Sequence, residues 1–158
     1  MIQINRRLKP GEYKVSDVFP DIGLNPILLE IFNDNREIDD VLKKTNVLVN
    51  EKTRYMSVNN KDGSIYIGTG HLNESESEIL YLDIIHELVH VRQQREGLDL
   101  FDQDFSYVDR ITEIEAYELT VKEARRIGLT DKQIKEYLQV EWITPEEHKR
   151  LARRLNVS

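Results

Sequence analysis

The stretch "HELVH", residues 86–90, places His86 and His90 four residues apart with Glu87 beside the first, in a chain with four histidines. Side chains four apart on a helix project from the same face, so both imidazoles can reach one ion. A carboxylate beside them need not bind the ion and can take a proton from metal-bound water. The pattern His-Glu-x-x-His therefore predicts zinc held by His86 and His90, with Glu87 as general base.

A long helix from residue 75 to 96, ended by Gly97, must present these side chains. Its apolar residues fill one broad arc, and a narrower polar stripe lies opposite. The stripe comprises Asp83, His86, Glu87, His90 and Gln94. The same stripe also fits a helix that only exposes a polar face to solvent. Asp83, one turn before His86, either orients a ligand through a hydrogen bond or is exposed.

The chain has no cysteine, so a third ligand must be His, Asp or Glu. No histidine follows His90 closely, which leaves acidic residues on the next predicted helix, residues 108–127. Glu113 falls in the middle of the apolar arc of that helix, whereas Glu115 falls on its charged side. A buried carboxylate is costly unless it is paired or binds a metal, so we predict Glu113 as the third zinc ligand. The alternative is a buried salt bridge from Glu113 to Arg92 or Arg110.

The order "HELVH" and then "EIEA" resembles the gluzincin zinc metallopeptidases, especially the minigluzincins, between residues 45 and 127. The resemblance implies a zincin-like fold, a peptide or protein substrate, and Glu113 as the ligand. It also implies that the strand before the histidine helix, "GSIYIGTG" at residues 63–70, pairs with an extended substrate. Tyr117 departs from the family pattern, because Asp or Asn usually stands there and contacts a zinc-bound histidine.

An enzyme of this class needs a donor that stabilises the oxyanion of the tetrahedral intermediate. The candidates are Tyr107, Tyr117, His71 and His148, and each also fits a packing or surface role. We select Tyr117 as the second catalytic residue beside Glu87, because it lies one helical turn from Glu113. The single tryptophan, Trp142, is expected in the core.

The rest of the chain predicts an α+β domain. Three β-rich runs, "TNVLVN", "TRYMSV" and "SIYIG", are expected to form a small antiparallel sheet that packs on the histidine helix and the following glutamate helix. We expect one domain over residues 1–158, made of a helical lead-in, a catalytic core and C-terminal helices. These parts span 1–44, 45–128 and 129–158, with the last two helices at about 130–140 and 144–155.

The net charge of −7 argues against nucleic acid as a partner. The basic runs "KEARRIG" and "HKRLARRL" have helical spacing and fit solvated helix faces. No apolar run approaches the length that crosses a membrane or drives secretion, so we expect a cytoplasmic protein without a membrane partner. The sequence does not indicate an oligomeric state.

These patterns together favour a zinc-dependent metallopeptidase or related hydrolase. The alternative is a catalytically weak or inactive zincin-like module that binds or regulates a partner. The departure at Tyr117 favours this alternative. The presence of Glu87 argues against it, because a structural zinc site needs no base and usually has four protein ligands.

Overall fold

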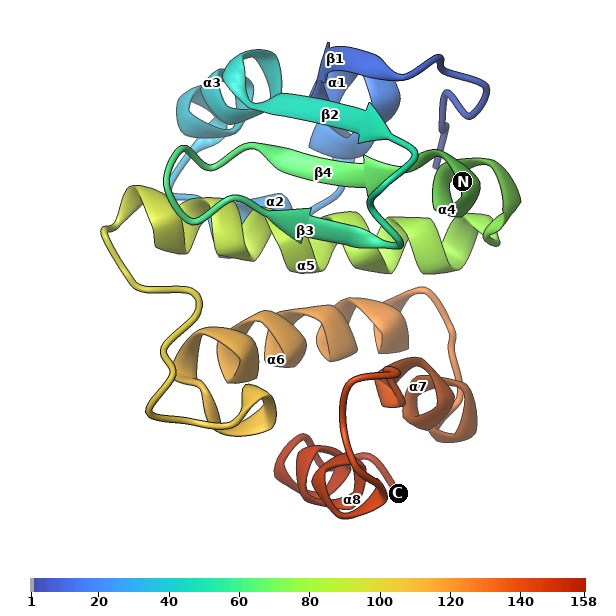
Figure 1. Ribbon diagram of the computed structural model, residues 1–158, viewed down its shortest axis with the longest axis vertical. Coiled ribbons are helices and arrows are strands. Elements are labelled where there is room, and N and C mark those ends of the chain that lie inside the picture. The colour runs from blue at the N-terminus through green and yellow to red at the C-terminus, as the bar shows by residue number, and fades with distance from the viewer. Residues whose placement is uncertain (1) are drawn as a thin grey trace.

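The computed structural model describes residues 2–158 and has an α+β architecture (Figure 1). The strands are β1 (Gly11–Lys14), β2 (Asn46–Asn50), β3 (Met56–Val58) and β4 (Ile65–Gly68). The helices are α1 (Val15–Val18), α2 (Leu28–Ile31), α3 (Asn35–Lys44), α4 (Thr69–Glu74), α5 (Ser77–Arg95), α6 (Ile111–Arg126), α7 (Asp131–Leu138) and α8 (Pro145–Arg154), with 3-10 turns η1 (Ile22–Leu24) and η2 (Tyr107–Asp109).

Within the described part of the chain, four strands form one mixed sheet in the order β1-β2-β4-β3. β2 and β4 pair in parallel, and β1 and β3 add antiparallel edges. The three predicted strands are present, but the prediction of an antiparallel sheet is wrong. The predicted helical lead-in is also incomplete, because β1 belongs to the sheet.

Burial explains why β2 pairs with β4. Val47 and Val49 of β2 are buried, and they lie in register beside the buried Ile65 and Ile67 of β4. Side chains on the same face of neighbouring strands pack together, so this pairing joins the two most apolar strands at the centre of the sheet. In β3 only Val58 is buried, and so short a strand is suited to an edge.

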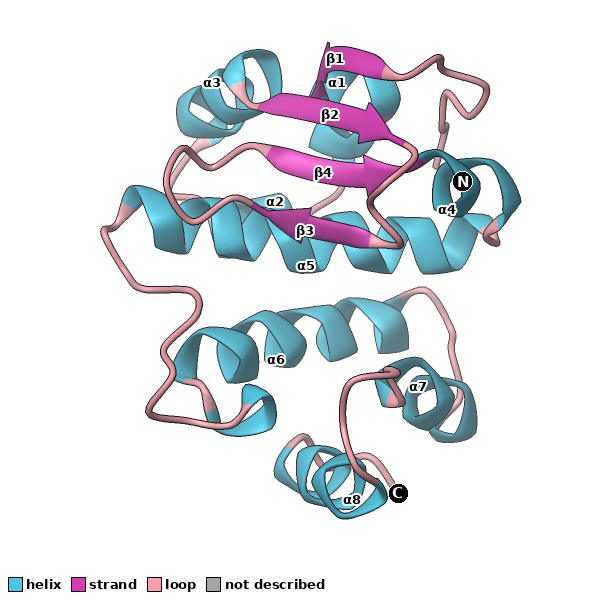
Figure 2. Cartoon of the chain, viewed as in Figure 1, coloured by secondary structure: helices cyan, strands magenta, loops and turns pink. Residues whose placement is uncertain are grey.

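The central helix α5 lies between the sheet and α6 (Figure 2). Because α5 is in contact with the protein on several sides, most of its residues are buried and it has no broad face towards solvent. The predicted helix begins two residues too early, at residue 75 instead of Ser77, and residues 69–74 form a separate helix, α4. Gly97 has φ +82, the left-handed conformation that ends helices, as predicted.

The C-terminal helices begin where the sequence predicts. Thr130 and Thr144 accept hydrogen bonds from the third backbone N–H of α7 and α8, and Pro145 is the first residue of α8. Ile134 and Leu151 belong to the same buried apolar cluster as the sheet residues, which confirms a single domain. No helix between residues 2 and 158 combines the length and apolar character needed to span a membrane.

Candidate metal centre

α5 places His86, Glu87 and His90 together in the interior. Their exposed fractions are 6%, 7% and 5%, so the alternative of a solvent-facing stripe is wrong for these three residues. One ligand atom from each lies within 4.8 Å of the other two, and the group could hold a metal ion. The helical spacing of the two histidines therefore produces the common face that the sequence predicts.

α6 brings Glu113 to the same point. Its Oε1 atom lies 3.0 Å from Nε2 of His86 and 3.2 Å from Nε2 of His90, and the two Nε2 atoms are 3.2 Å apart. The small buried residues Ala116 and Ala124 lie at the packed side of α6 and allow a close approach to α5. Glu113 is 5% exposed, as its position within the apolar arc predicts.

The spacing of these three atoms fits a metal site. Nitrogen and oxygen ligands that surround zinc tetrahedrally at 2.0–2.1 Å lie roughly 3.3 Å from each other. The three distances measured here, from 3.0 to 3.2 Å, come close to that value. Two imidazoles and one carboxylate also form a donor set that zinc accepts.

The predicted alternative, a salt bridge from Glu113 to Arg92 or Arg110, is wrong. Arg92 pairs with Glu115 and with Glu96, and Nε of Arg110 donates to the backbone carbonyl of Asp102. The charge of Glu113 is thus balanced by the histidines or by an ion between them.

Electrostatics at the centre follow from burial and close charges. Burial by itself lowers the pKa of His90, but the carboxylate of Glu113 outweighs burial and raises that pKa to about 9. Burial likewise favours the neutral form of Glu113, but the two histidines hold its pKa far below the usual value. For His86, burial is the larger effect and lowers the pKa. Glu113 is therefore an anion that attracts either a proton on His90 or a metal cation.

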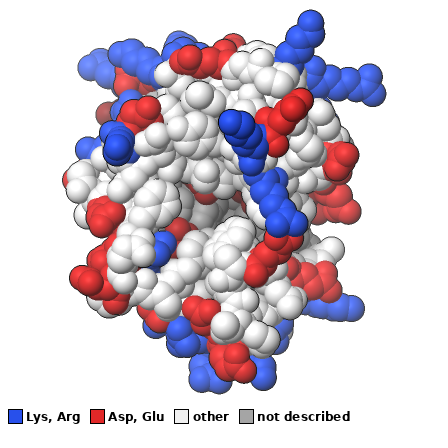
Figure 3. Space-filling model, in the orientation of Figure 1, with Lys and Arg blue, Asp and Glu red and all other residues white. Residues whose placement is uncertain are grey.

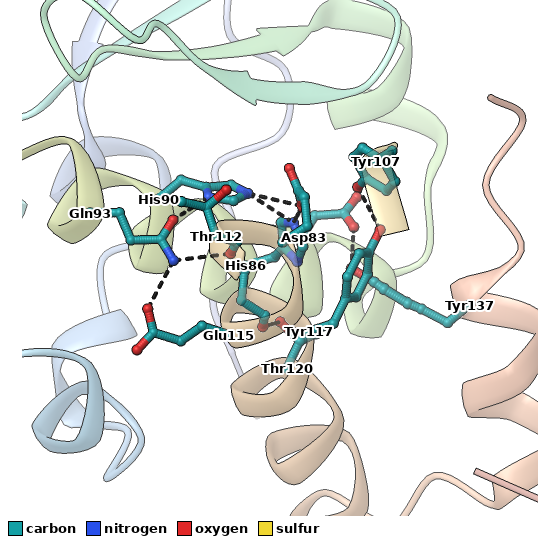
Figure 4. Close-up of polar contacts among 12 residues, drawn as sticks. Asp83, His86, His90, Gln93, Tyr107, Thr112, Glu115, Tyr117, Thr120 and Tyr137 are labelled. Carbon is teal, nitrogen blue, oxygen red and sulfur yellow. Dashed lines mark hydrogen bonds and ion pairs between the residues drawn. The ribbon is translucent and has the colours of Figure 1, made fainter. Parts of the chain in front are cut away.

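Gln93 fixes the tautomer of His90 (Figure 4). Its amide nitrogen donates to the carbonyl of Thr112 at 3.0 Å and to Glu115 at 2.9 Å, so its oxygen must face His90. That oxygen lies 2.7 Å from Nδ1 of His90, which must carry the hydrogen. In the neutral imidazole, Nε2 of His90 is then the nitrogen with the lone pair, and it lies beside Glu113 and His86. Sequence analysis missed Gln93, whose role depends on the backbone of α6.

His86 lacks such a partner. Its Nδ1 atom is buried without a hydrogen bond to any described residue. Tyr117 stands where the family resemblance expects Asp or Asn, and its ring packs on His86 at 4.3 Å between centroids. The hydroxyl of Tyr117 lies 2.7 Å from that of Tyr107 (Figure 4). The departure noted in the sequence thus replaces a polar contact with an aromatic one.

Glu87, like His86, has a buried atom without a hydrogen bond within residues 2–158, in this case Oε2. Burial raises the pKa of Glu87 to about 8. A carboxyl group with a pKa near neutrality can both take up and release a proton.

A cleft of about 630 Å³ is lined by His86, Glu87, His90 and Glu113, together with Tyr107 and Tyr117. Figure 3 shows the hollow near the middle of one face, with a mainly uncharged lining. Its walls come from β3 and the residues before it, from α5, from the loop before α6, and from the 136–142 segment, which ends α7 and follows it. Trp142 lies in this wall and is 52% exposed, so its predicted core position is wrong.

Asp83 is neither a partner of a predicted zinc ligand nor freely exposed. It accepts a hydrogen bond from the hydroxyl of Tyr137 at 2.6 Å and lies 2.7 Å from Nε2 of His71. Nδ1 of His71 lies 2.8 Å from the hydroxyl of Ser75. His71 and Tyr107 line the cleft with Tyr117, whereas His148 contacts the carbonyl of Lys135 outside it.

The prediction that the strand at residues 63–70 pairs with substrate is also wrong. β4 lies inside the sheet, where β2 and β3 occupy both of its edges. A Cβ atom on Gly68 would lie 2.0 Å from the carbonyl oxygen of Thr53, so this glycine allows the loop before β3 to approach. The free edge at the cleft belongs to β3, whose three residues all line it.

Comparison with known proteins adds no relative to this description: no family model, curated protein or solved structure matches the chain. The fold and site therefore define an α+β protein with a buried His-Glu-x-x-His cluster that could hold a metal ion.

Proposed function

We propose that this protein is a zinc-dependent peptidase of the zincin-like type, with His86, His90 and Glu113 as the metal ligands. The observation that carries the proposal is the convergence of these three donors, from two helices, beside Glu87 in an open cleft. Three protein ligands with an accessible side are typical of catalytic zinc sites, whereas structural sites are usually closed by four. The resemblance of "HELVH" and "EIEA" to gluzincins supports the same conclusion.

Zinc bound at this position would make water acidic near neutral pH and would polarise the substrate carbonyl. With zinc bound, Glu87 would act as the general base towards the attacking water, because its Oε2 atom has no competing protein partner. The same carboxyl group would then donate the proton to the leaving amine. Gln93 would hold the hydrogen of His90 on Nδ1, so that Nε2 is the nitrogen that faces the zinc ion.

The pair Tyr107 and Tyr117 supplies the donor to the oxyanion. Each phenol has one hydrogen, but their mutual hydrogen bond uses only one. The second hydrogen has no acceptor within the described residues and lies in the cleft wall. Burial raises the pKa of both phenols, so they stay protonated near neutral pH. This retains Tyr117 as catalytic and adds Tyr107 as the residue that orients it.

An extended peptide fits the free edge of β3. The backbone of Met56–Val58 faces no further strand on that side and lines the cleft beside the metal ligands. Strand addition uses such unpaired backbone groups to align a peptide without reading its side chains. The mainly apolar lining suits the side chains of that peptide.

The test compares the zinc-loaded wild-type protein with Glu87→Gln on a mixed peptide library, with cleavage followed by mass spectrometry. Loss of a general base lowers the rate by about 10²–10⁴-fold. We expect cleavage by the wild type, near-complete loss in Glu87→Gln, and equal zinc content. Equal cleavage by both proteins would assign the activity to a contaminant and contradict the proposal.

The second candidate function is a zincin-like binding or regulatory module, and one observation favours it. Glu141 accepts a hydrogen bond from Tyr55 at 2.5 Å and pairs with Arg54 at 3.0 Å, which ties the 136–142 segment to the residues before β3. All three residues of this tie line the cleft. A protein that binds the library peptides but cleaves none, with zinc bound, would establish this alternative.

A further inference from the structure

Arg110 is a cation of the cleft without an acidic partner. Two arginines line the cleft, and Arg54 is paired with Glu141 at 3.0 Å. The half-buried Arg110 donates from Nε to the backbone carbonyl of Asp102 at 3.1 Å. Among residues 2–158, no carboxylate forms an ion pair with its guanidinium.

The acidic neighbours of Arg110 are engaged elsewhere. Asp109 pairs with Arg150 at 2.8 Å and with Arg154 at 3.3 Å. The oxygen Oε1 of Glu113 lies between the two histidines. The positive charge of Arg110 is therefore available to a molecule that enters the cleft.

The geometry of Arg110 suits a carboxylate. The bond from Nε to Asp102 restrains the side chain and leaves the two terminal nitrogens free. These nitrogens form the planar fork that matches the two oxygens of a carboxylate. Arg110 is the N-cap residue of α6, three residues before Glu113, and both residues line the cleft.

Charge is distributed unevenly along the cleft. Arg110 lies at the start of α6, whereas Glu136 and Glu141 line the wall formed by α7 and the residues after it. Figure 1 shows the start of α6 and the helix α7 on opposite sides of the molecule, with α5 running above α6. An extended peptide across the metal ligands would thus meet the free cation Arg110 on one side and the exposed Glu136 on the other, since Glu141 is paired with Arg54.

We propose that Arg110 determines substrate specificity by binding a carboxylate within about three residues of the scissile bond, given an extended chain of about 3.3 Å per residue. This inference rests on the proposed peptidase function. The carboxylate is either an acidic side chain or the C-terminus of a peptide.

The test uses degenerate peptide pools that differ only by Glu or Gln at one position, each with a C-terminal acid or amide. Cleavage is measured for zinc-loaded wild type, Arg110→Gln and the control Arg36→Gln, an exposed position of α3 outside the cleft. Binding of the same pools to zinc-loaded Glu87→Gln, with and without Arg110→Gln, gives a readout independent of turnover. Zinc content and thermal unfolding show whether each variant is folded.

A charged hydrogen-bonded pair of this kind changes affinity by at least about tenfold. We expect wild type and Arg36→Gln to prefer one acidic pool by that factor, and Arg110→Gln to lose the preference. Preference for the C-terminal acid over the amide identifies the C-terminus, and preference for Glu over Gln identifies a side chain.

Equal use of acidic and neutral pools by the wild type, or a preference that survives Arg110→Gln, overturns the role of Arg110 and leaves the peptidase proposal intact. Absence of all cleavage, with tighter binding of acidic pools that depends on Arg110, overturns the peptidase proposal and retains the carboxylate site. Neither cleavage nor preferential binding overturns both.

Discussion

At the scale of residues, the state of His90 depends on Gln93. The carboxamide of Gln93 is held by Thr112 and Glu115 and accepts the hydrogen of Nδ1 of His90. Such supporting bonds orient metal-binding imidazoles and raise their basicity. The chain from Glu115 through Gln93 to His90 therefore links the partly exposed side of α6 to the buried centre.

We expect Gln93→Leu to lower zinc affinity by about 10–100-fold, because His90 loses the acceptor that fixes its tautomer. Competition for zinc with a chromogenic chelator measures the change. Gln94→Leu is the matched control, since Gln94 follows in α5 and donates to the carbonyl of Lys61 instead. If Gln93→Leu and Gln94→Leu bind zinc as tightly as the wild type does, Gln93 has no such role.

At the scale of elements, α8 is attached to η2 by Asp109. Both carboxylate oxygens accept hydrogen bonds from Arg150, and one also pairs with Arg154. The hydrogen bond from Arg150, followed by that from Ser106, lowers the pKa of Asp109 from 3.8 to about 2. A carboxyl group with a lowered pKa stabilises the fold above its unfolded pKa, and this contribution is lost as pH falls through the folded pKa.

We expect Asp109→Asn to lower the free energy of unfolding by about 1 kcal/mol at neutral pH, because the partly exposed arginines weaken the pair by solvent screening. The corresponding loss in Tm is about 2–4 °C. Thermal unfolding of the variant and the wild type should differ by this amount above about pH 4 and converge towards pH 2. A constant difference over that range would show that the charge of Asp109 does not contribute.

The sequence predicted the helices better than the sheet. The starts of α7 and α8 have local signals. Thr130 and Thr144 accept hydrogen bonds from backbone N–H groups in the first turn of each helix, and Pro145 is the first residue of α8. The order of strands has no local signal: β2 and β3 are joined by a short turn, yet β4 lies between them in the sheet. That order follows from the packing of buried residues distant in sequence, such as Val47 and Ile65.

The candidate site likewise contains residues that the sequence predicts and residues that it does not. The positions of His86, Glu87, His90 and Glu113 follow from helical periodicity, and the structure brings all four together. Gln93 was assigned no role, and Arg110 was considered only as a salt-bridge partner of Glu113, because their observed partners at Thr112 and Asp102 are backbone carbonyls that any residue supplies. Trp142 was misplaced because a large apolar side chain near helices fits a cleft wall as well as a core.

At the scale of the whole molecule, the 136–142 segment connects α7 to α5 and to the residues before β3. Tyr137 bonds to Asp83, while Glu141 bonds to Tyr55 and Arg54. Ile134, Leu138 and Leu151 belong to the common core, so removing residues 129–158 would expose apolar surface rather than simply open the cleft. Single substitutions at Glu141 are therefore the better test of whether the 136–142 segment restricts access to the cleft.

We expect Glu141→Ala to loosen the segment and to increase peptide cleavage about two- to fivefold, since exposed pairs contribute about 0.2–1 kcal/mol. Fluorescence of Trp142, the single tryptophan, reports on the segment directly, because its ring lies 6.1 Å from Tyr55 and 5.5 Å from Tyr107. Glu146→Ala, at an exposed position of α8, is the control. Unchanged emission and cleavage in Glu141→Ala would exclude a restraint.

The most direct test of the account is the metal content of the purified protein after mild chelation and reloading with zinc, measured by elemental analysis. Wild type and Glu118→Ala, an exposed position of α6, should each contain about one zinc per chain. Glu113→Ala should contain far less while it remains folded. Zinc retained at the wild-type level in Glu113→Ala, or no zinc in the wild type, would contradict the three-ligand centre on which the proposed chemistry depends.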